Sequence, residues 1–85
     1  MFSVYVLLNA KYSLYVGYSE NPHNRLLEHN AGIVHSTSKG RPWRHIFLEY
    51  FLEKKDALRR EQYFKTTQGK RMLKILLKTA LHKAK

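Results

Sequence analysis

The chain has 85 residues, no cysteine, and 16 lysine and arginine residues against six aspartate and glutamate residues, for a formal net charge of +10. This length predicts one domain over residues 1–85, and the absence of cysteine excludes disulfides and thiolate metal sites. No apolar run is long enough for a membrane span, and the N-terminal residues do not resemble a secretion signal. We therefore expect a cytoplasmic protein with no membrane partner.

The positive charge is concentrated in the second part of the chain. Residues 1–52 carry a net charge of +2, whereas residues 53–85 carry +8. Such a basic half favours a polyanionic partner, and nucleic-acid backbones are the commonest one. A solvated helical surface is the alternative interpretation.

The first elements in chain order are the strands of a predicted β-hairpin. Residues 2–8 are rich in β-branched and aromatic side chains and predict a buried strand, residues 9–13 a turn, and residues 14–18 a second strand. Gly17 is unusual inside a strand. It indicates that another backbone or a ligand comes close at this position.

A short helix, a polar loop and a third strand follow. Asn21 is a suitable N-cap, Pro22 is suited to the first helical position, and Gly32 is placed to end the helix. Residues 33–43 form the predicted loop and residues 44–51 the predicted strand.

The C-terminal part of the chain has helical periodicity. We expect one helix over residues 54–67, a break at Gly69, and one amphipathic helix over residues 70–83. The predicted order is β-β-α-β-α-α. It corresponds to the α+β class, with a small three-stranded antiparallel sheet flanked by helices.

Glu61 is a charged residue on a predicted apolar surface. It shares a helix face with Ala57, Leu58 and Phe64, which should face the sheet. A carboxylate there is costly unless it is ion-paired, hydrogen-bonded or bound to a metal. Both a structural ion pair and a metal-binding or catalytic role remain open from the pattern.

The first helix carries Arg25 and His29 four residues apart, so both project from one side. We expect Leu26 and Leu27 to anchor this helix and to leave Arg25 and His29 near its edge. A guanidinium fits the geometry of a phosphate, although two exposed surface residues are the simpler interpretation.

Tyr5 and Tyr15 lie ten positions apart on the two strands of the hairpin. A central turn would place them opposite or diagonal to each other. They are either core residues or members of one site, and a nearby cation such as Arg25 would favour the phenolate. The five histidines lack the spacing of a zinc site.

With these residues in view, the chain resembles the GIY-YIG nuclease superfamily, in particular its small stand-alone bacterial members and the N-terminal domain of the excision-repair nuclease C subunit. The resemblance rests on Ser3-Val4-Tyr5, Tyr15-Val16-Gly17, residues 24–32, Ser36-Thr37, Arg41-Pro42-Trp43, residues 57–61, Lys65-Thr66 and Gly69-Lys70-Arg71. These segments cover nearly the whole chain in order. The first triplet lacks its glycine, since Ser3 stands there.

The resemblance implies hydrolysis of nucleic-acid phosphodiester bonds with one divalent metal ion, Mg²⁺ or Mn²⁺. Tyr15 or Tyr5 would help deprotonate water, Arg25 would stabilise phosphate charge, His29 matches the helix histidine, and Glu61 would bind the metal. The substrate-binding residues that we expect are Gly17, Ser36, Thr37, Lys39, Arg41, Lys65, Lys70 and Arg71.

The expected substrate is DNA, in repair or recombination. Larger members have additional domains that choose the substrate, so we expect weak cutting alone, a protein partner that supplies specificity, or recognition of structure over sequence. The alternatives are a non-catalytic nucleic-acid-binding module with this fold, and a protein-interaction module that uses the aromatic residues Tyr12, Tyr18 and Trp43.

Overall fold

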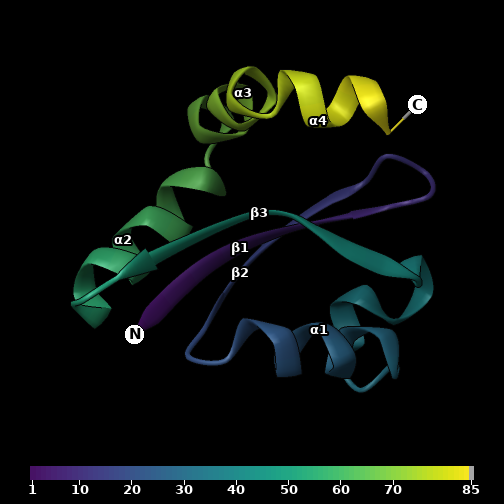
Figure 1. Ribbon diagram of the computed structural model, residues 1–85, viewed down its shortest axis with the longest axis horizontal. Coiled ribbons are helices and arrows are strands. Elements are labelled where there is room, and N and C mark those ends of the chain that lie inside the picture. Colours follow the sequence, from purple (N-terminus) through teal and green to yellow (C-terminus); the bar gives the residue numbers. More distant parts are fainter. Residues whose placement is uncertain (85) are drawn as a thin grey trace.

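The computed structural model describes residues 1–84, and its centre is a three-stranded antiparallel sheet (Figure 1). The strands are β1 (Phe2–Asn9), β2 (Leu14–Ser19) and β3 (Trp43–Phe51), in the spatial order β2-β1-β3. The central strand β1 is paired on both sides, and its six residues from position 3 to position 8 are all buried. β2 and β3 are therefore the edge strands.

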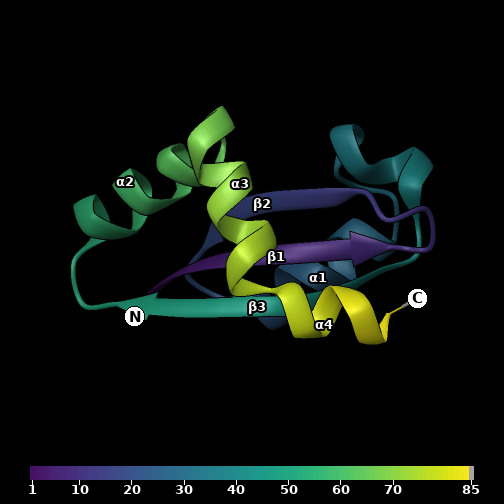
Figure 2. The same ribbon diagram turned by 90° about the horizontal axis from the view of Figure 1, so that it is seen from above.

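Helices cover both faces of this sheet. Figure 1 shows α1 (Pro22–Asn30) on one face, and α2 (Lys54–Phe64), α3 (Thr67–Leu76) and α4 (Lys78–Lys83) on the other. In Figure 2, α3 starts near β2 and crosses the strands, and α4 runs along β3. The predicted α+β class is confirmed, and the predicted order β-β-α-β-α-α agrees with the structure except that its last helix is divided into α3 and α4. Within residues 1–84, no helix is both long and apolar enough to span a bilayer.

The alternation of side chains along the strands produces two cores. The core under α2 and α3 contains Val4, Val6, Val16, Ala57, Phe64, Leu73 and Leu77. The opposite face carries a smaller cluster of Tyr5, Leu7 and Trp43, with Tyr15, Leu26 and Leu48 packed against it. The smaller cluster lies under α1 and contains the tyrosines that the sequence singled out.

A β-bulge sets the side-chain directions of β3 at the site. The pairing with β1 passes from Val6 opposite Phe47 to Leu7 opposite His45, so Ile46 is the extra residue. Both Ile46 and Phe47 pack against the larger core, while the His45 ring contacts the ring of Tyr5. The extra residue therefore turns His45 toward the face with the tyrosines.

The predicted loop at residues 33–43 is partly helical. It contains the short 3₁₀ helix η1 (His35–Gly40) and leads into β3 at Trp43. The Arg41–Pro42 peptide bond is cis. The polar composition of this segment predicted a surface connection but did not reveal the helical turn.

The C-terminal helices divide at other residues than predicted. Gly69 does not break a helix; it lies in the first turn of α3, and the break falls at Lys65 and Thr66. The Thr66 hydroxyl accepts a hydrogen bond from the Gly69 amide at 3.0 Å and donates one to the Tyr63 carbonyl at 2.6 Å. The predicted helix 70–83 is likewise two helices, α3 and α4, which meet at Leu77.

We predict that Gly69→Ala destabilises the protein, although glycine-to-alanine changes in helices usually stabilise. A Cβ at Gly69 would lie less than 3.0 Å from the Tyr63 carbonyl group and from the Phe64 backbone. Since backbone must move, we expect a loss of about 1–3 kcal/mol in the free energy of unfolding. Urea denaturation measures this, with Gln68→Ala as the exposed control. Equal stabilities would contradict the close packing of α2 and α3.

Candidate active site

The side chain of Tyr5 lies across the neighbouring strand at Gly17. The two residues are paired in the sheet, and a Cβ at Gly17 would lie less than 3.0 Å from the ring and hydroxyl of Tyr5. Only glycine leaves this space free, so the phenol can extend over β2, an edge strand. Gly17 was expected to make room for substrate, but the group that fills the space is Tyr5, and Gly17 itself is buried.

Tyr15 lies beside Tyr5 on the same face of the sheet. Leu7 is opposite Tyr15 and Tyr5 is opposite Gly17, so the two tyrosines are diagonal neighbours, as predicted. Their ring centroids are 6.5 Å apart, and the Tyr15 ring is 5.0 Å from the ring of His29. Tyr15 is only half-buried, so it can meet a molecule from the solvent.

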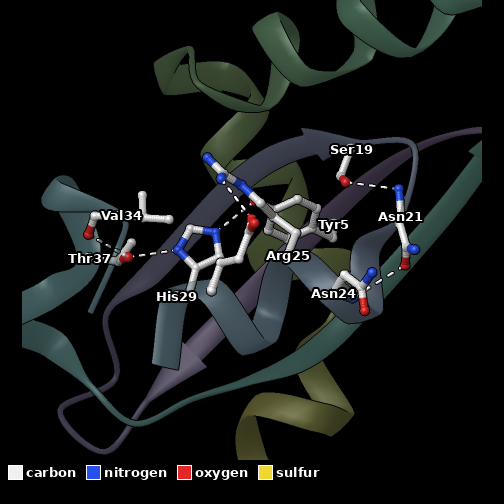
Figure 3. A network of polar contacts seen from close by, with 9 residues as sticks. Tyr5, Ser19, Asn21, Asn24, Arg25, His29, Val34 and Thr37 are labelled. Atoms are coloured by element: carbon white, nitrogen blue, oxygen red, sulfur yellow. Dashed lines mark hydrogen bonds and ion pairs between the residues drawn. The ribbon is translucent and has the colours of Figure 1, made fainter. Parts of the chain in front are cut away.

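A chain of hydrogen bonds starts at the Tyr5 hydroxyl (Figure 3). This hydroxyl lies 2.7 Å from Nε2 of His29, and Nδ1 of His29 lies 2.6 Å from the Thr37 hydroxyl. The Thr37 hydroxyl in turn donates to the carbonyl of Val34. If Thr37 donates there, it accepts from Nδ1–H of His29, which leaves Nε2 as the acceptor for the Tyr5 proton.

Burial favours the neutral forms of both members of the tyrosine–histidine pair. It raises the pKa of Tyr5 to about 12, opposed by hydrogen bonding to Arg25 and by the charge of that guanidinium. Burial also lowers the pKa of His29, and the positive charge of Arg25 adds to this. At neutral pH the proton therefore rests on Tyr5.

His29 and Leu27 exchange the roles that the sequence suggested. We expected Leu27 to anchor the first helix and His29 to lie near its edge. His29 is fully buried under α1, whereas 67% of Leu27 is exposed. The helical spacing allows either side of α1 to face the sheet. The hydrogen bonds of His29 with Tyr5 and Thr37 favour the orientation in which His29 is buried.

Arg25 projects from α1 toward the Tyr5 hydroxyl. The helix start is fixed by Asn21, whose side chain accepts a hydrogen bond from the Asn24 amide at 3.3 Å. The guanidinium of Arg25 pairs with Glu28 at 3.0 Å, and 38% of the Arg25 side chain is exposed. Because this pair is open to solvent, a phosphate can compete for the guanidinium.

Glu61 faces inward on α2, as predicted. Only 13% of its side chain is exposed, and Oε2 accepts a hydrogen bond from Lys65 at 3.1 Å. Its negative charge contributes to the raised pKa of Tyr5. The Lys65 side chain is 46% exposed, so the ion pair is not sealed from water.

The metal that the resemblance implies would have few protein ligands. Among residues 1–84, no group of three or more His, Asp or Glu side chains is arranged to hold a metal ion. A single carboxylate still fits Mg²⁺, which keeps several waters and is commonly bound through one or two carboxylates plus substrate phosphates. Glu61, shielded and, among residues 1–84, ion-paired only to the partly exposed Lys65, suits that mode of binding.

The expected substrate-binding residues do not all face solvent. Thr37 is 1% exposed and is engaged with His29, so the structure does not support direct contact with substrate. The Arg41 guanidinium packs over Gly32 and its Nε donates to the Ser38 carbonyl at 2.7 Å. The exposed ones are Ser36, Lys39, Arg41, Lys65, Lys70 and Arg71.

Asn30 and Trp43 support the site in roles that the sequence did not predict; Trp43, which the protein-interaction alternative would use to bind a partner, is buried. Asn30 accepts a hydrogen bond from the Trp43 amide at 2.7 Å and donates one to its carbonyl at 2.9 Å, which ties the end of α1 to the start of β3. The Trp43 indole donates to the carbonyl of Thr37 at 2.9 Å. These contacts join residues that are not neighbours in the sequence. The one sequence signal that could have indicated them is an asparagine at the end of a helix.

Comparison with known proteins identifies the family of the chain. Residues 1–74 match the family described as GIY-YIG catalytic domain. The chain belongs to the GIY-YIG family. The match includes all five residues that the resemblance assigned to catalysis: Tyr5, Tyr15, Arg25, His29 and Glu61.

Within the GIY-YIG family, the chain is similar to small proteins of comparable length. It is 36% identical over 74 residues to a UPF0213 protein of Staphylococcus haemolyticus, covering 86% of this chain and 90% of that protein. A UPF0213 protein of Lactiplantibacillus plantarum is 39% identical over 75 residues, covering 85% and 74%. The solution structure of the UPF0213 protein BH0048 from Bacillus halodurans has a TM-score of 0.55 at 30% identity, covering 89% and 85%.

We predict that Tyr5 ionises near pH 12 in the folded protein, above the usual tyrosine value of about 10. The ring-carbon chemical shifts of labelled tyrosines would report this titration. In Gly17→Ala the added Cβ displaces the Tyr5 ring, so we expect its titration to move toward the usual value. A wild-type Tyr5 that titrates near the usual tyrosine value of about 10 would contradict the buried arrangement.

A second prediction concerns stability at acidic pH. His29 has a lowered pKa in the folded state, so below about pH 6.5 the unfolded chain binds a proton that the folded chain does not. The free energy of unfolding should fall as the pH decreases through this range. His29→Gln should flatten the dependence. Parallel curves for wild type and His29→Gln would contradict this assignment.

Proposed function

We propose that this protein is a metal-dependent endonuclease that hydrolyses phosphodiester bonds in nucleic acid, with DNA as the expected form. The observation that carries the proposal is the Tyr5–His29 hydrogen bond beside Arg25 and Glu61. These groups come from β1, α1 and α2 and meet near the edge strand β2. The family relationship supports a nuclease-type protein.

In this proposal Arg25 binds the scissile phosphate. Its guanidinium keeps its charge at any working pH and matches two phosphate oxygens. It lies next to the Tyr5 phenol and is partly exposed. It would thereby stabilise the negative charge that develops on the phosphate in the transition state.

The tyrosine–histidine pair can move a proton away from the attacking water. With its pKa near 12, Tyr5 is a poor base while its own proton stays in place. Transfer of that proton to Nε2 of His29 lets the phenol oxygen take one from water, so no free phenolate accumulates. Thr37 holds Nδ1 of His29 and fixes the tautomer that this transfer requires. Tyr15, half-exposed beside His29, is a second candidate for contact with the water.

Glu61 would hold the divalent ion, Mg²⁺ or Mn²⁺. Bound there with water and phosphate oxygens, such an ion lowers the pKa of bound water and shields phosphate charge. For this the Lys65 ammonium must release Oε2 of Glu61. Its 46% exposure allows this movement at little cost.

A binding module without catalysis is the second candidate. The observation that favours it is the Glu61–Lys65 ion pair, which gives the carboxylate a structural partner without a metal. This candidate predicts salt-sensitive nucleic-acid binding without strand scission. A role in repair or recombination, a cytoplasmic location and a protein partner that supplies specificity stay predictions.

We predict that labelled nucleic acid is cut only with Mg²⁺ or Mn²⁺, and that Glu61→Gln and Arg25→Lys reduce the rate by about 10²–10³. The matched controls are Glu53→Gln and Arg59→Lys. Arg59 pairs with Asp56 at 3.0 Å across one helical turn, just as Arg25 pairs with Glu28. A gel assay across duplex, branched and single-stranded substrates measures the rates.

Two results would contradict the hydrolase proposal. One is the absence of metal-dependent cutting on every substrate by a folded protein. The other is an equal loss of rate in the control variants, because it would mean that overall charge matters and the site does not. If the folded protein cuts no substrate but still binds nucleic acid in a salt-sensitive way, the non-catalytic binding module is the function that remains.

A further inference from the structure

A basic groove lies along the edge strand β2, next to the candidate site. Its volume is about 440 Å³, and it lies between β2 and α3, with Lys65 from the α2–α3 connection at its side. The groove is lined by Tyr12, Leu14, Tyr15, Val16, Lys65, Lys70, Leu73 and Lys74. Tyr15 is shared with the candidate site, and Lys65 contacts Glu61.

The lining of this groove combines positive charge with apolar and aromatic surface. Three lysines stand at the groove and none of its lining residues is acidic. The charge continues beyond it, since residues 62–84 contain six lysines and arginines and no aspartate or glutamate. A polyanion that also presents flat apolar groups would match both properties.

Tyr12 is a preformed flat surface at the hairpin end of the groove. It adopts a left-handed backbone conformation with φ of 66° at the β1–β2 turn, and 39% of the residue is exposed. Its hydroxyl donates to the carbonyl of Leu81 in α4 at 3.3 Å, 69 residues away in sequence. A tyrosine ring held at both ends loses little entropy when another ring stacks on it.

From this combination we propose that the groove binds single-stranded nucleic acid that flanks the scissile phosphate, with the lysines on the backbone and Tyr12 stacked against a base. The inference rests on the proposed function for its position, because the shared Tyr15 leads from the groove to the site. It names the substrate class: a strand with unpaired bases beside the cut.

The choice of a single strand follows from the chemistry of the lining. A duplex presents phosphates outward and keeps its bases stacked inside. It would therefore contact the lysines but neither Tyr12 nor the apolar side chains of the groove, Leu14, Val16 and Leu73. Single strands present both phosphates and base faces. Proteins that bind them combine cationic grooves with aromatic side chains in this way.

The test is equilibrium binding in EDTA, which prevents metal-dependent cutting. Fluorescence anisotropy would compare a labelled single strand with the duplex of the same sequence for the whole chain. Tyr12→Ala should weaken single-strand binding about five- to a hundredfold. Tyr12→Phe, which keeps the ring and loses only the hydrogen bond to Leu81, should weaken binding much less than Tyr12→Ala.

The lysines are tested by salt dependence. Lys70→Gln with Lys74→Gln should lower the slope of log affinity against log salt by about 1.4 for a single strand, since two phosphate contacts are lost. The matched control is Lys54→Gln with Lys55→Gln, which removes equal charge from exposed positions at the start of α2. Tyr50→Ala is the control for Tyr12, because Tyr50 is an exposed tyrosine on the other edge strand.

Equal losses in the groove variants and their controls would overturn the inference, as would duplex binding at least as tight as single-strand binding. Circular dichroism melts confirm that each variant is folded, and the lysine pair keeps the test valid if Tyr12→Ala does not fold. Tight single-strand binding without any cutting in Mg²⁺ or Mn²⁺ would refute the hydrolase proposal alone. Metal-dependent cutting, together with wild-type single-strand affinity in the groove variants, would refute the groove proposal alone.

Discussion

The arrangement of the site depends on one steric condition, the missing side chain at position 17. Tyr5 belongs to the central strand, which is covered on both faces, so its phenol would ordinarily stay in the core. Because β2 has no Cβ at this position, the ring lies across that strand and its hydroxyl meets His29 and Arg25. A residue of the buried central strand thereby places its hydroxyl near the edge of the sheet.

The layered architecture brings the charges to the same place. α1 covers one face and α2 the other, so Arg25 and Glu61 approach the sheet from opposite sides. Their opposite effects on the pKa of Tyr5 show that both charges reach the phenol. A carboxylate and a guanidinium one turn apart on the same helix would form an ion pair, as Arg25 does with Glu28. Arg25 and Glu61 instead pair with Glu28 and Lys65 of their own segments.

Local patterns in the sequence predicted the hairpin, the capped first helix, the diagonal tyrosines and the inward carboxylate. These features depend on alternation, on helical spacing and on the chemistry of asparagine, proline and glycine, which act over a few residues. The family resemblance added the chemical roles that we propose for these residues. The sequence did not predict features that depend on residues far away in the chain. His29 is buried because its two ring nitrogens form hydrogen bonds with Tyr5 and Thr37. Position 69 lies in a helix and requires glycine for packing, since the Tyr63 carbonyl occupies the space that a side chain would need.

The position of β2 at the border of the sheet has a consequence for solubility. An unpaired strand border can add a strand from another copy of the chain, which is a common route to aggregation. Here Lys65, Lys70 and Lys74 stand beside that border. A second copy would bring its own lysines toward them, and like charges would repel. Charge repulsion at this edge of the sheet would therefore disfavour strand-to-strand pairing between copies of the chain.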